Sequence, residues 1–322
     1  MKEITFLNQN SSKWQQFESL LSLKTGSNPD LIADLYIQLT DDLSYARTNY
    51  PKSKTTQYLN SLAAKAHQEI YKNKKEKSSR IITFWKYELP MVFKKSHKQL
   101  LYSLLIFTTA LLVGVVSAAN DADFVRLIMG DTHVNQTLEN IDKGDPMAVY
   151  KSMPQGTMFL YITINNIRVS FMCFAAGLLF SVGTGFLLFT NGVMLGAFQY
   201  FFYEKGLFLD SFLVIWIHGT LEISAFVIAG AAGLTMGNSI LFPGTYSRLQ
   251  SFMSGAKQGI KIVIGLLPVF IAAGFLESFI TRYTHMPMWL SLSIILISLT
   301  FIVGYFIIYP IRLNRKNKTL SI

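Results

Sequence analysis

A histidine and a carboxylate lie four residues apart in the middle of a long apolar run. His218 and Glu222 both fall within the run from Phe212 to Met236. Four residues are slightly more than one turn of an α-helix, so both side chains are expected on the same helix face. A charged group in the hydrocarbon core of a membrane is costly and usually faces protein or water. This pair is therefore the first candidate for a functional site.

A third ionisable residue, Glu277, occurs near the end of a later apolar run. Ala273 and Gly274 precede it by about one helical turn and would let another helix approach closely on that face. The two glutamates could then meet across a helix pair and share a proton. His218 would add a metal ligand or a member of a proton relay. The alternative interpretation is a buried polar network that only fixes helix register.

Three further polar residues are predicted to join this intramembrane cluster: Asn166, Arg168 and Asn191. The asparagines would make polar contacts between helices or at helix ends, and Arg168 would pair with a glutamate or anchor its helix at the interface. The spacing His-x-x-x-Glu lacks the second histidine of the zinc hydrolases. We therefore assign no metal ligands, name no catalytic residue and expect no cofactor.

The composition is that of a polytopic helical membrane protein. Of 322 residues, 51% are hydrophobic and only 15% are charged, and the apolar residues gather in runs long enough for membrane helices. Because these runs are continuous rather than alternating, strands are not expected. The predicted fold class is all-α, a helical membrane bundle with an amino-terminal soluble helical domain. The net charge of +10 fits the excess of basic residues on cytoplasmic segments, so no nucleic-acid partner is expected.

The chain is predicted to divide near residue 97. Residues 1–97 would form a cytoplasmic helical domain that ends in an amphipathic helix lying in the membrane interface. Residues 98–322 would form a membrane domain of six helices. Basic residues precede the first apolar run and follow the last one, which predicts that both termini are cytoplasmic. The acid-rich segment 120–155 would then face outward.

Six membrane elements are expected from the apolar runs. They are residues 100–119, 169–190, 192–203, 208–238, 259–280 and 289–309. The pair Asn191-Gly192 is typical of a turn and separates the second element from the short third one. Gly219, near the middle of the fourth element, indicates either a helix broken after His218 or one long tilted helix. The sequence favours neither of these two alternatives.

Small residues recur at the spacing that lets membrane helices pack closely. Six of them are predicted to mediate helix packing: Gly192, Gly196, Gly219, Ala225, Ala229 and Gly233. The last three follow one another at intervals of four residues and continue the face of His218 and Glu222. This stripe predicts a homodimer interface, although the same residues could serve helix packing within the chain.

Several of these residues recur in an order that resembles a known family. The elements are Asn191-Gly192-x-x-x-Gly196, His218-Gly219-x-x-Glu222-x-x-Ala225, Ala229-Gly230-Ala231-Ala232-Gly233-Leu234 and Ala272-Ala273-Gly274-Phe275-Leu276-Glu277. Over about residues 162–281 the chain resembles the stage II sporulation protein M family of integral membrane proteins. Residues 42–71 also look like the amino-terminal region of the longer members.

The resemblance implies a scaffold in the bacterial inner membrane. In spore formers the family member holds a peptidoglycan-degrading complex during engulfment. The resemblance therefore implies other membrane or cytoplasmic proteins as partners, in addition to the lipid bilayer. An ion-coupled transporter or channel that uses His218, Glu222 and Glu277 is the alternative, and an intramembrane metal-dependent hydrolase is a further one. Of the two possibilities, the sequence favours a protein without enzymatic activity.

Overall fold

The computed structural model describes residues 1–22, 29–71, 79–151, 153–284 and 286–319. The chain folds into two units, Met1–Ile81 and Ile82–Ile322, each with a hydrophobic core of its own. All regular structure among the described residues is helical, which confirms the all-α fold class.

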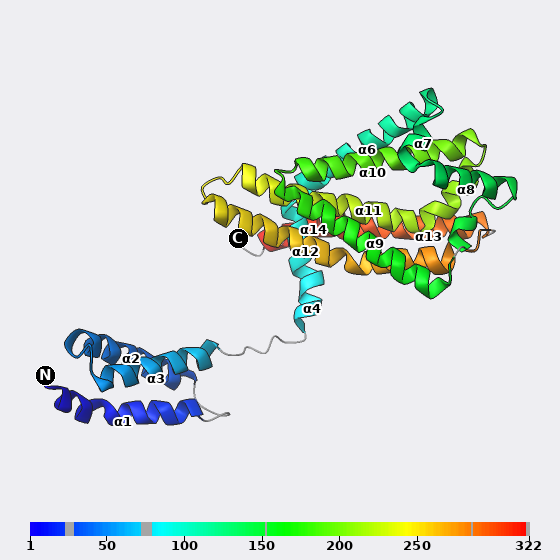
Figure 1. The fold of residues 1–322 in the computed structure, drawn as a ribbon. Coiled ribbons are helices and arrows are strands. Elements are labelled where there is room, and N and C mark those ends of the chain that lie inside the picture. The colour runs from blue at the N-terminus through cyan, green and yellow to red at the C-terminus, as the bar shows by residue number, and fades with distance from the viewer. Residues whose placement is uncertain (23–28, 72–78, 152, 285, 320–322) are drawn as a thin grey trace. The chain divides into compact units, whose positions relative to one another are not determined.

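The first unit is a bundle of three helices. They are α1 (Glu3–Ser22), α2 (Pro29–Asn49) and α3 (Lys54–Tyr71) (Figure 1). Apolar residues from all three helices form the core, and the large side chains buried most deeply are Trp14, Phe17, Leu39, Leu59 and Leu62. Their spacing of three and four residues gives each helix the apolar stripe that such a core requires.

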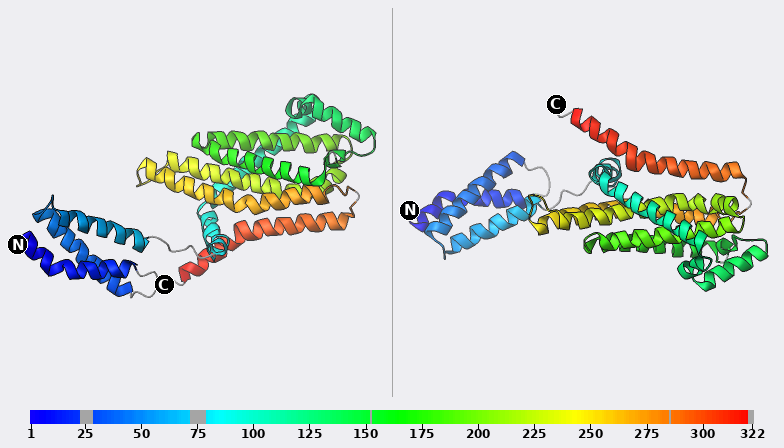
Figure 2. Two further views of the ribbon diagram at one scale, coloured as in Figure 1. Left: turned by 60° about the horizontal axis from the view of Figure 1, so that its bottom comes forward. Right: turned by 90° about the horizontal axis from the view of Figure 1, so that it is seen from above.

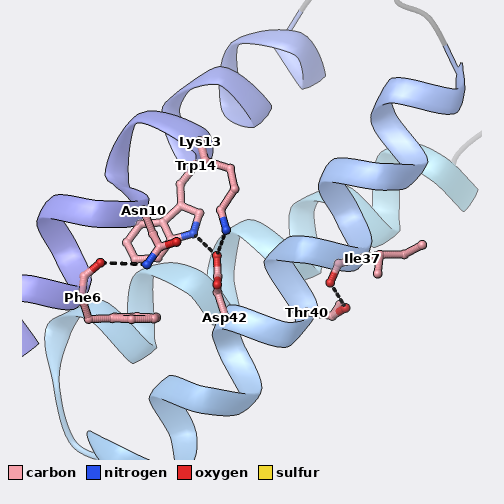
Figure 3. Close-up of polar contacts among 7 residues, drawn as sticks. All are labelled: Phe6, Asn10, Lys13, Trp14, Ile37, Thr40 and Asp42. Carbon is pink, nitrogen blue, oxygen red and sulfur yellow. Dashed lines mark hydrogen bonds and ion pairs between the residues drawn. The ribbon is translucent and has the colours of Figure 1, made fainter. Parts of the chain in front are cut away.

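A polar contact joins α1 to α2 beside this core. The indole Nε1 of Trp14 donates a hydrogen bond to Asp42 Oδ2 at 2.8 Å, and Lys13 Nζ lies 2.6 Å from the same oxygen (Figure 3). A buried indole N–H usually needs a hydrogen-bond partner, and Asp42 supplies it. The carboxylate is in turn balanced by the ammonium group of Lys13.

The second unit begins with a short helical segment that packs against the membrane helices. It comprises α4 (Ser79–Thr83), the π-helix η1 (Phe84–Glu88) and α5 (Leu89–Lys95), which run across the direction of the long helices (Figure 1). Leu89 and Phe93 are almost fully buried in the core of this unit. Tyr305 donates a hydrogen bond to the carbonyl oxygen of Trp85 at 2.6 Å. This segment buries its apolar face against the bundle, and the second unit begins within it, at Ile82.

Six helices of the second unit are long and apolar enough to cross a membrane. They are α6 (His97–Asn120), α9 (Gln155–Ala175) with η3 (Ala176–Leu178), α10 (Val182–Glu204), α11 (Phe208–Leu241), α12 (Arg248–Phe275) with η4 (Leu276–Ile280), and α13 (Met288–Val303) with η5 (Gly304–Ile308) and α14 (Tyr309–Thr319). They run side by side, and α11 contacts α6, α9, α10, α12 and α13 (Figures 1 and 2). In α11, 67% of the most apolar stretch is buried, against 22% in α6. The central helix is therefore the one that carries His218 and Glu222.

The second and third spans differ from the prediction. The helix expected over residues 169–190 is interrupted by a turn at residues 179–181, where Phe180 and Ser181 have φ values of 52° and 68°. The turn predicted at Asn191-Gly192 is wrong, because both residues lie inside α10. Hydropathy could not locate the real turn, because two of its three residues are apolar themselves.

The fourth span is one continuous helix. α11 passes through Gly219 without a break, so the interpretation as a single long helix is correct and the broken helix is wrong. A Cβ atom at Gly219 would meet no atom closer than 3.6 Å. This glycine therefore leaves space beside His218 rather than allowing a close helix contact.

Glycines do bring α6 and α10 together. A Cβ atom at Gly192 would lie 2.7 Å from the carbonyl oxygen of Phe107, and one at Gly196 would lie 2.1 Å from that of Leu111. On the facing helix, a Cβ atom at Gly114 would lie 2.2 Å from the carbonyl oxygen of Val193. Such backbone contacts leave no room for a side chain, which explains glycine at these positions.

The stripe of small residues on α11 is also used within the chain. Ala225 and Ala229 are fully buried, and a Cβ atom at Gly233 would lie 2.3 Å from Thr184 Oγ1 and 2.7 Å from the carbonyl oxygen of Cys173. Neighbouring spans of the same chain thus cover the stripe, which is the second of the two uses that its spacing allows. The homodimer stays a prediction.

The segment between the first two spans covers one end of the bundle. Residues 121–154 include α7 (Phe124–Met129), α8 (Asp131–Asp142) and the 3-10 turn η2 (Ala148–Lys151) (Figure 1). Their buried residues Val125, Val134 and Tyr150 share a core with residues of α10 and α11. The acid-rich segment is thus folded onto the helices and can contribute side chains to a site there.

Candidate functional site

The three ionisable residues singled out in the sequence lie together inside the second unit. His218 Nε2 is 3.9 Å from Glu277 Oε1, and one ligand atom from each of His218, Glu222 and Glu277 lies within 4.8 Å of the others. His218 and Glu222 project from the same face of α11, as their four-residue spacing requires. Glu277 comes from η4 at the end of α12. The contact between α11 and α12 therefore assembles the cluster.

The π-helical turn η4 aims two residues at His218. In this turn the backbone N–H of Thr281 reaches the carbonyl oxygen of Leu276, five residues earlier, at 2.8 Å. Single π-turns inside α-helices occur frequently at functional sites. Here the turn brings both Glu277 and Thr281 to the imidazole, whose Nδ1 lies 3.0 Å from Thr281 Oγ1.

The hydrogen bonds around Thr281 assign the tautomer of His218. The Thr281 hydroxyl donates its one proton to the carbonyl oxygen of Leu276 at 3.2 Å. The same oxygen can then only accept a hydrogen bond from His218, so Nδ1 of the imidazole carries a proton. In the neutral ring, Nε2 is consequently unprotonated, and its lone pair is on the side of Glu277.

Tyr150 covers the cluster from the segment between the first two spans. Its ring meets the His218 ring edge to face, with centroids 5.5 Å apart and planes inclined by 67°. Burial raises the pKa of the Tyr150 hydroxyl well above its ordinary value, and the nearby Glu277 and Glu222 raise it further. Tyr150 is therefore a neutral hydroxyl that shields the imidazole from solvent.

The cluster opens into a cavity of about 640 Å³ between the spans. Apolar residues form most of its wall, and no lysine or arginine lines it in the part of the chain that the structure describes. The polar residues of the wall other than the cluster are Asn165, Asn166, Ser170, Asn191 and His133. A mostly apolar cavity with a few convergent polar groups is the usual form of a small-ligand site.

Asn166 on α9 is the neighbour of Glu222 in this wall. Its amide lies near the Glu222 carboxylate, and both residues line the cavity. Asn166 is only 8% exposed, and its Nδ2 has no properly oriented hydrogen-bond partner among the described residues. A buried amide that faces a cavity without a full set of partners can bind a ligand there.

The other residues predicted for the cluster are placed differently. Arg168 is exposed and does not line the cavity, which corrects its assignment to the polar cluster. Asn191 lines the cavity, but its Nδ2 donates to the carbonyl oxygen of Leu187 in its own helix at 2.8 Å. Gly219 also lines the cavity, where it faces space rather than another helix.

Two residues of the site were missed in the sequence. Thr281 follows Glu277 by four residues, so the spacing that drew attention to His218 and Glu222 would have identified it as well. Tyr150 carried no such signal, because it lies in a polar segment far from His218 in sequence. Only the folding of that segment onto α10 and α11 brings its ring to the imidazole.

Each of the two units matches the profile of a known protein family. Residues 103–282 match the sequence profile described as stage II sporulation protein M, and this match covers more than half of the chain. The chain belongs to this family. The matched range begins in α6 and includes every residue of the cluster, so it extends further towards the amino terminus than the motifs alone indicated.

The soluble unit matches a different profile. Residues 4–72 correspond to a domain of unknown function, DUF8413. No curated protein and no solved structure matches the chain. The comparisons thus establish a multi-pass membrane protein of the stage II sporulation protein M family that also carries a second, separate domain.

Proposed function

We propose that this protein is an integral membrane scaffold that anchors or organises a multiprotein complex in the bacterial inner membrane. The proposal rests on one observation, the joining of a separately folded three-helix unit to a membrane unit of the stage II sporulation protein M family. The three-helix unit has its own core and needs no contact with the second unit to bury it. Such a unit is suited to recruit a partner while the spans hold it at the membrane.

Apolar side chains on the surface of the three-helix unit are candidates for this recruitment. Ile4 on α1 is 74% exposed and Ile37 on α2 is 58% exposed, so both side chains are accessible to a partner. Figure 3 shows the Ile37 side chain directed away from the contact between Trp14 and Asp42. The basic residues that flank the first and last spans support a cytoplasmic position for this unit and for both termini.

The scaffold proposal predicts a stoichiometric partner that depends on the soluble unit. Affinity capture of the full chain from crosslinked native membranes is expected to recover such a partner. The variant carrying Ile4→Asp and Ile37→Asp is expected to lose it while reaching the same level in the membrane. The exposed Asp41 on the same unit provides a control, since Asp41→Asn should retain the partner. Recovery of the chain alone, or only as a homo-oligomer, would contradict the proposal.

A second candidate function is ion-coupled transport, which the cavity with its buried histidine and carboxylates favours. These side chains can carry protons, and ionisable residues inside membrane proteins often mark ion pathways. Purified protein in liposomes is then expected to dissipate a proton gradient, recorded with a pH-sensitive dye inside the vesicles. Glu222→Gln should lower the rate about tenfold or more, because it removes a proton carrier without changing side-chain size.

The control for this measurement is Glu204→Gln. Glu204 lies at the end of α10, beside Lys205 and outside the cavity, so its replacement should leave the flux unchanged. Equal rates for the wild-type protein and Glu222→Gln would exclude proton transport through the cluster.

A further inference from the structure

We propose that His218, Glu222 and Glu277 bind a divalent transition-metal ion such as Zn²⁺ inside the membrane unit. The proposal goes beyond a scaffold role and can fail without affecting it.

The distances within the cluster suit one shared ion. Nitrogen and carboxylate ligands lie about 2.0–2.2 Å from Zn²⁺, so two ligands of a tetrahedral ion are about 3.4 Å apart. The 3.9 Å between His218 Nε2 and Glu277 Oε1 is close to this separation, whereas it is too long for a direct hydrogen bond. All three ligand atoms lie within 4.8 Å of one another, so shifts of the glutamate side chains by about 1–1.5 Å complete the set.

The tautomer of His218 prepares Nε2 for a cation. Metal-binding histidines usually donate their other ring N–H to an oxygen atom, which fixes the ring and raises the basicity of the ligating nitrogen. His218 Nδ1 donates in this way to Thr281 Oγ1 at 3.0 Å. His218 Nε2 and Glu277 Oε1 are then two acceptors 3.9 Å apart, and no direct hydrogen bond joins them. A cation between these two acceptors would satisfy both.

Charge balance favours a divalent ion. A neutral imidazole with two carboxylates carries two negative charges, and no lysine or arginine among the described residues lines the cavity to offset them. One nitrogen and two oxygen donors suit borderline ions such as Zn²⁺, Mn²⁺, Fe²⁺ and Co²⁺. The buried and incompletely bonded amide of Asn166 would hold the Glu222 carboxylate in its ligating orientation.

Three protein ligands leave a coordination position unfilled. In zinc sites of this kind the fourth position takes water or a small ligand. Here the unfilled position would face the cavity of about 640 Å³, whose wall is mostly apolar. The ion would therefore join α11 to α12 and remain accessible to a small molecule that enters the cavity.

The test uses Co²⁺, whose visible absorption reports coordination by protein ligands. Full-length protein in detergent is stripped with a chelator and titrated with CoCl₂. We expect saturation at one equivalent per chain and displacement by Zn²⁺. The variant Glu277→Gln should bind Co²⁺ at least about tenfold more weakly, because a ligand is lost, and Glu204→Gln should bind as the wild type does.

A second pair of variants separates ligation from folding. Thr281→Val removes the acceptor for His218 Nδ1 but no ligand, and we expect it to weaken Co²⁺ binding about 10–100-fold. Thr281→Ser keeps the hydroxyl and should restore binding. In addition, Zn²⁺ should raise the unfolding temperature of the wild-type protein but not that of Glu277→Gln. Absence of saturable Co²⁺ binding by the wild-type protein, or equal affinity in Glu277→Gln, would overturn the proposal.

Discussion

Replacement of Gly196 by leucine is expected to disrupt the packing of α6 against α10. A Cβ atom at this position would lie 2.1 Å from the carbonyl oxygen of Leu111 and 2.9 Å from the backbone nitrogen of Val115. Neither backbone atom can move without displacing α6 as a whole. Overpacking of a rigid site costs about 1–3 kcal/mol or more, and a side chain that clashes with backbone atoms belongs at the upper end of that range. Thermal unfolding of the detergent-solubilised protein can be monitored by the loss of its size-exclusion peak. The midpoint temperature of unfolding should be clearly lower for the variant than for the wild-type protein.

The same helix provides the control for this substitution. Gly185 also lies in α10, but a Cβ atom there would meet no atom within 4 Å. Gly185→Leu is therefore expected to leave the midpoint nearly unchanged. If both substitutions lowered it equally, the loss would come from replacing glycine in a membrane helix in general and not from the contact with α6.

Replacement of Trp14 by alanine is expected to unfold the three-helix unit while the membrane unit remains folded. Trp14 is 2% exposed, and its ring lies near those of Phe6 and Tyr58, with centroid distances of 5.6 and 6.3 Å. Truncation of a buried tryptophan costs about 3–5 kcal/mol, which approaches the whole stability of a small domain. Hydrogen exchange of the full-length protein should show loss of protection in residues 3–71, with residues 82–319 unaffected.

Trp14→Phe separates the packing of the indole from its hydrogen bond. Phenylalanine retains most of the buried ring but cannot donate to Asp42, whose carboxylate keeps its ion pair with Lys13 (Figure 3). The expected cost is about 1–2 kcal/mol, so protection should fall only in part. Loss of protection throughout both units after Trp14→Ala would mean that the two units do not fold independently.

The scaffold proposal and the proposed ion site concern different parts of the chain. The proposed recruitment would use the exposed face of the three-helix unit, whereas the proposed ion site would use α11, η4 and the segment that carries Tyr150. Variants in one part should leave the other part unaffected. The tests can therefore show whether the membrane unit only anchors the soluble unit or also binds a ligand of its own.

The class of this protein and the candidates for its site could be predicted from the amino-acid sequence alone. Long apolar runs required membrane helices, because only a helix satisfies its backbone hydrogen bonds in lipid. A histidine and a glutamate inside such a run had to face protein or water, so His218 and Glu222 could be identified without a structure. The motifs that contain them also indicated the family that the comparison establishes.

The bounds of the helices and the contacts between their residues became clear only from the folded chain. Hydropathy records where apolar residues are, but a turn of apolar residues at 179–181 and a glycine packed inside a helix at Gly192 give the wrong signal. The rotation of each helix is set by packing against its neighbours, which exposes Arg168 and covers the stripe of small residues on α11. Thr281 and Tyr150 reach His218 for the same reason, because contacts between distant segments exist only once the helices have packed.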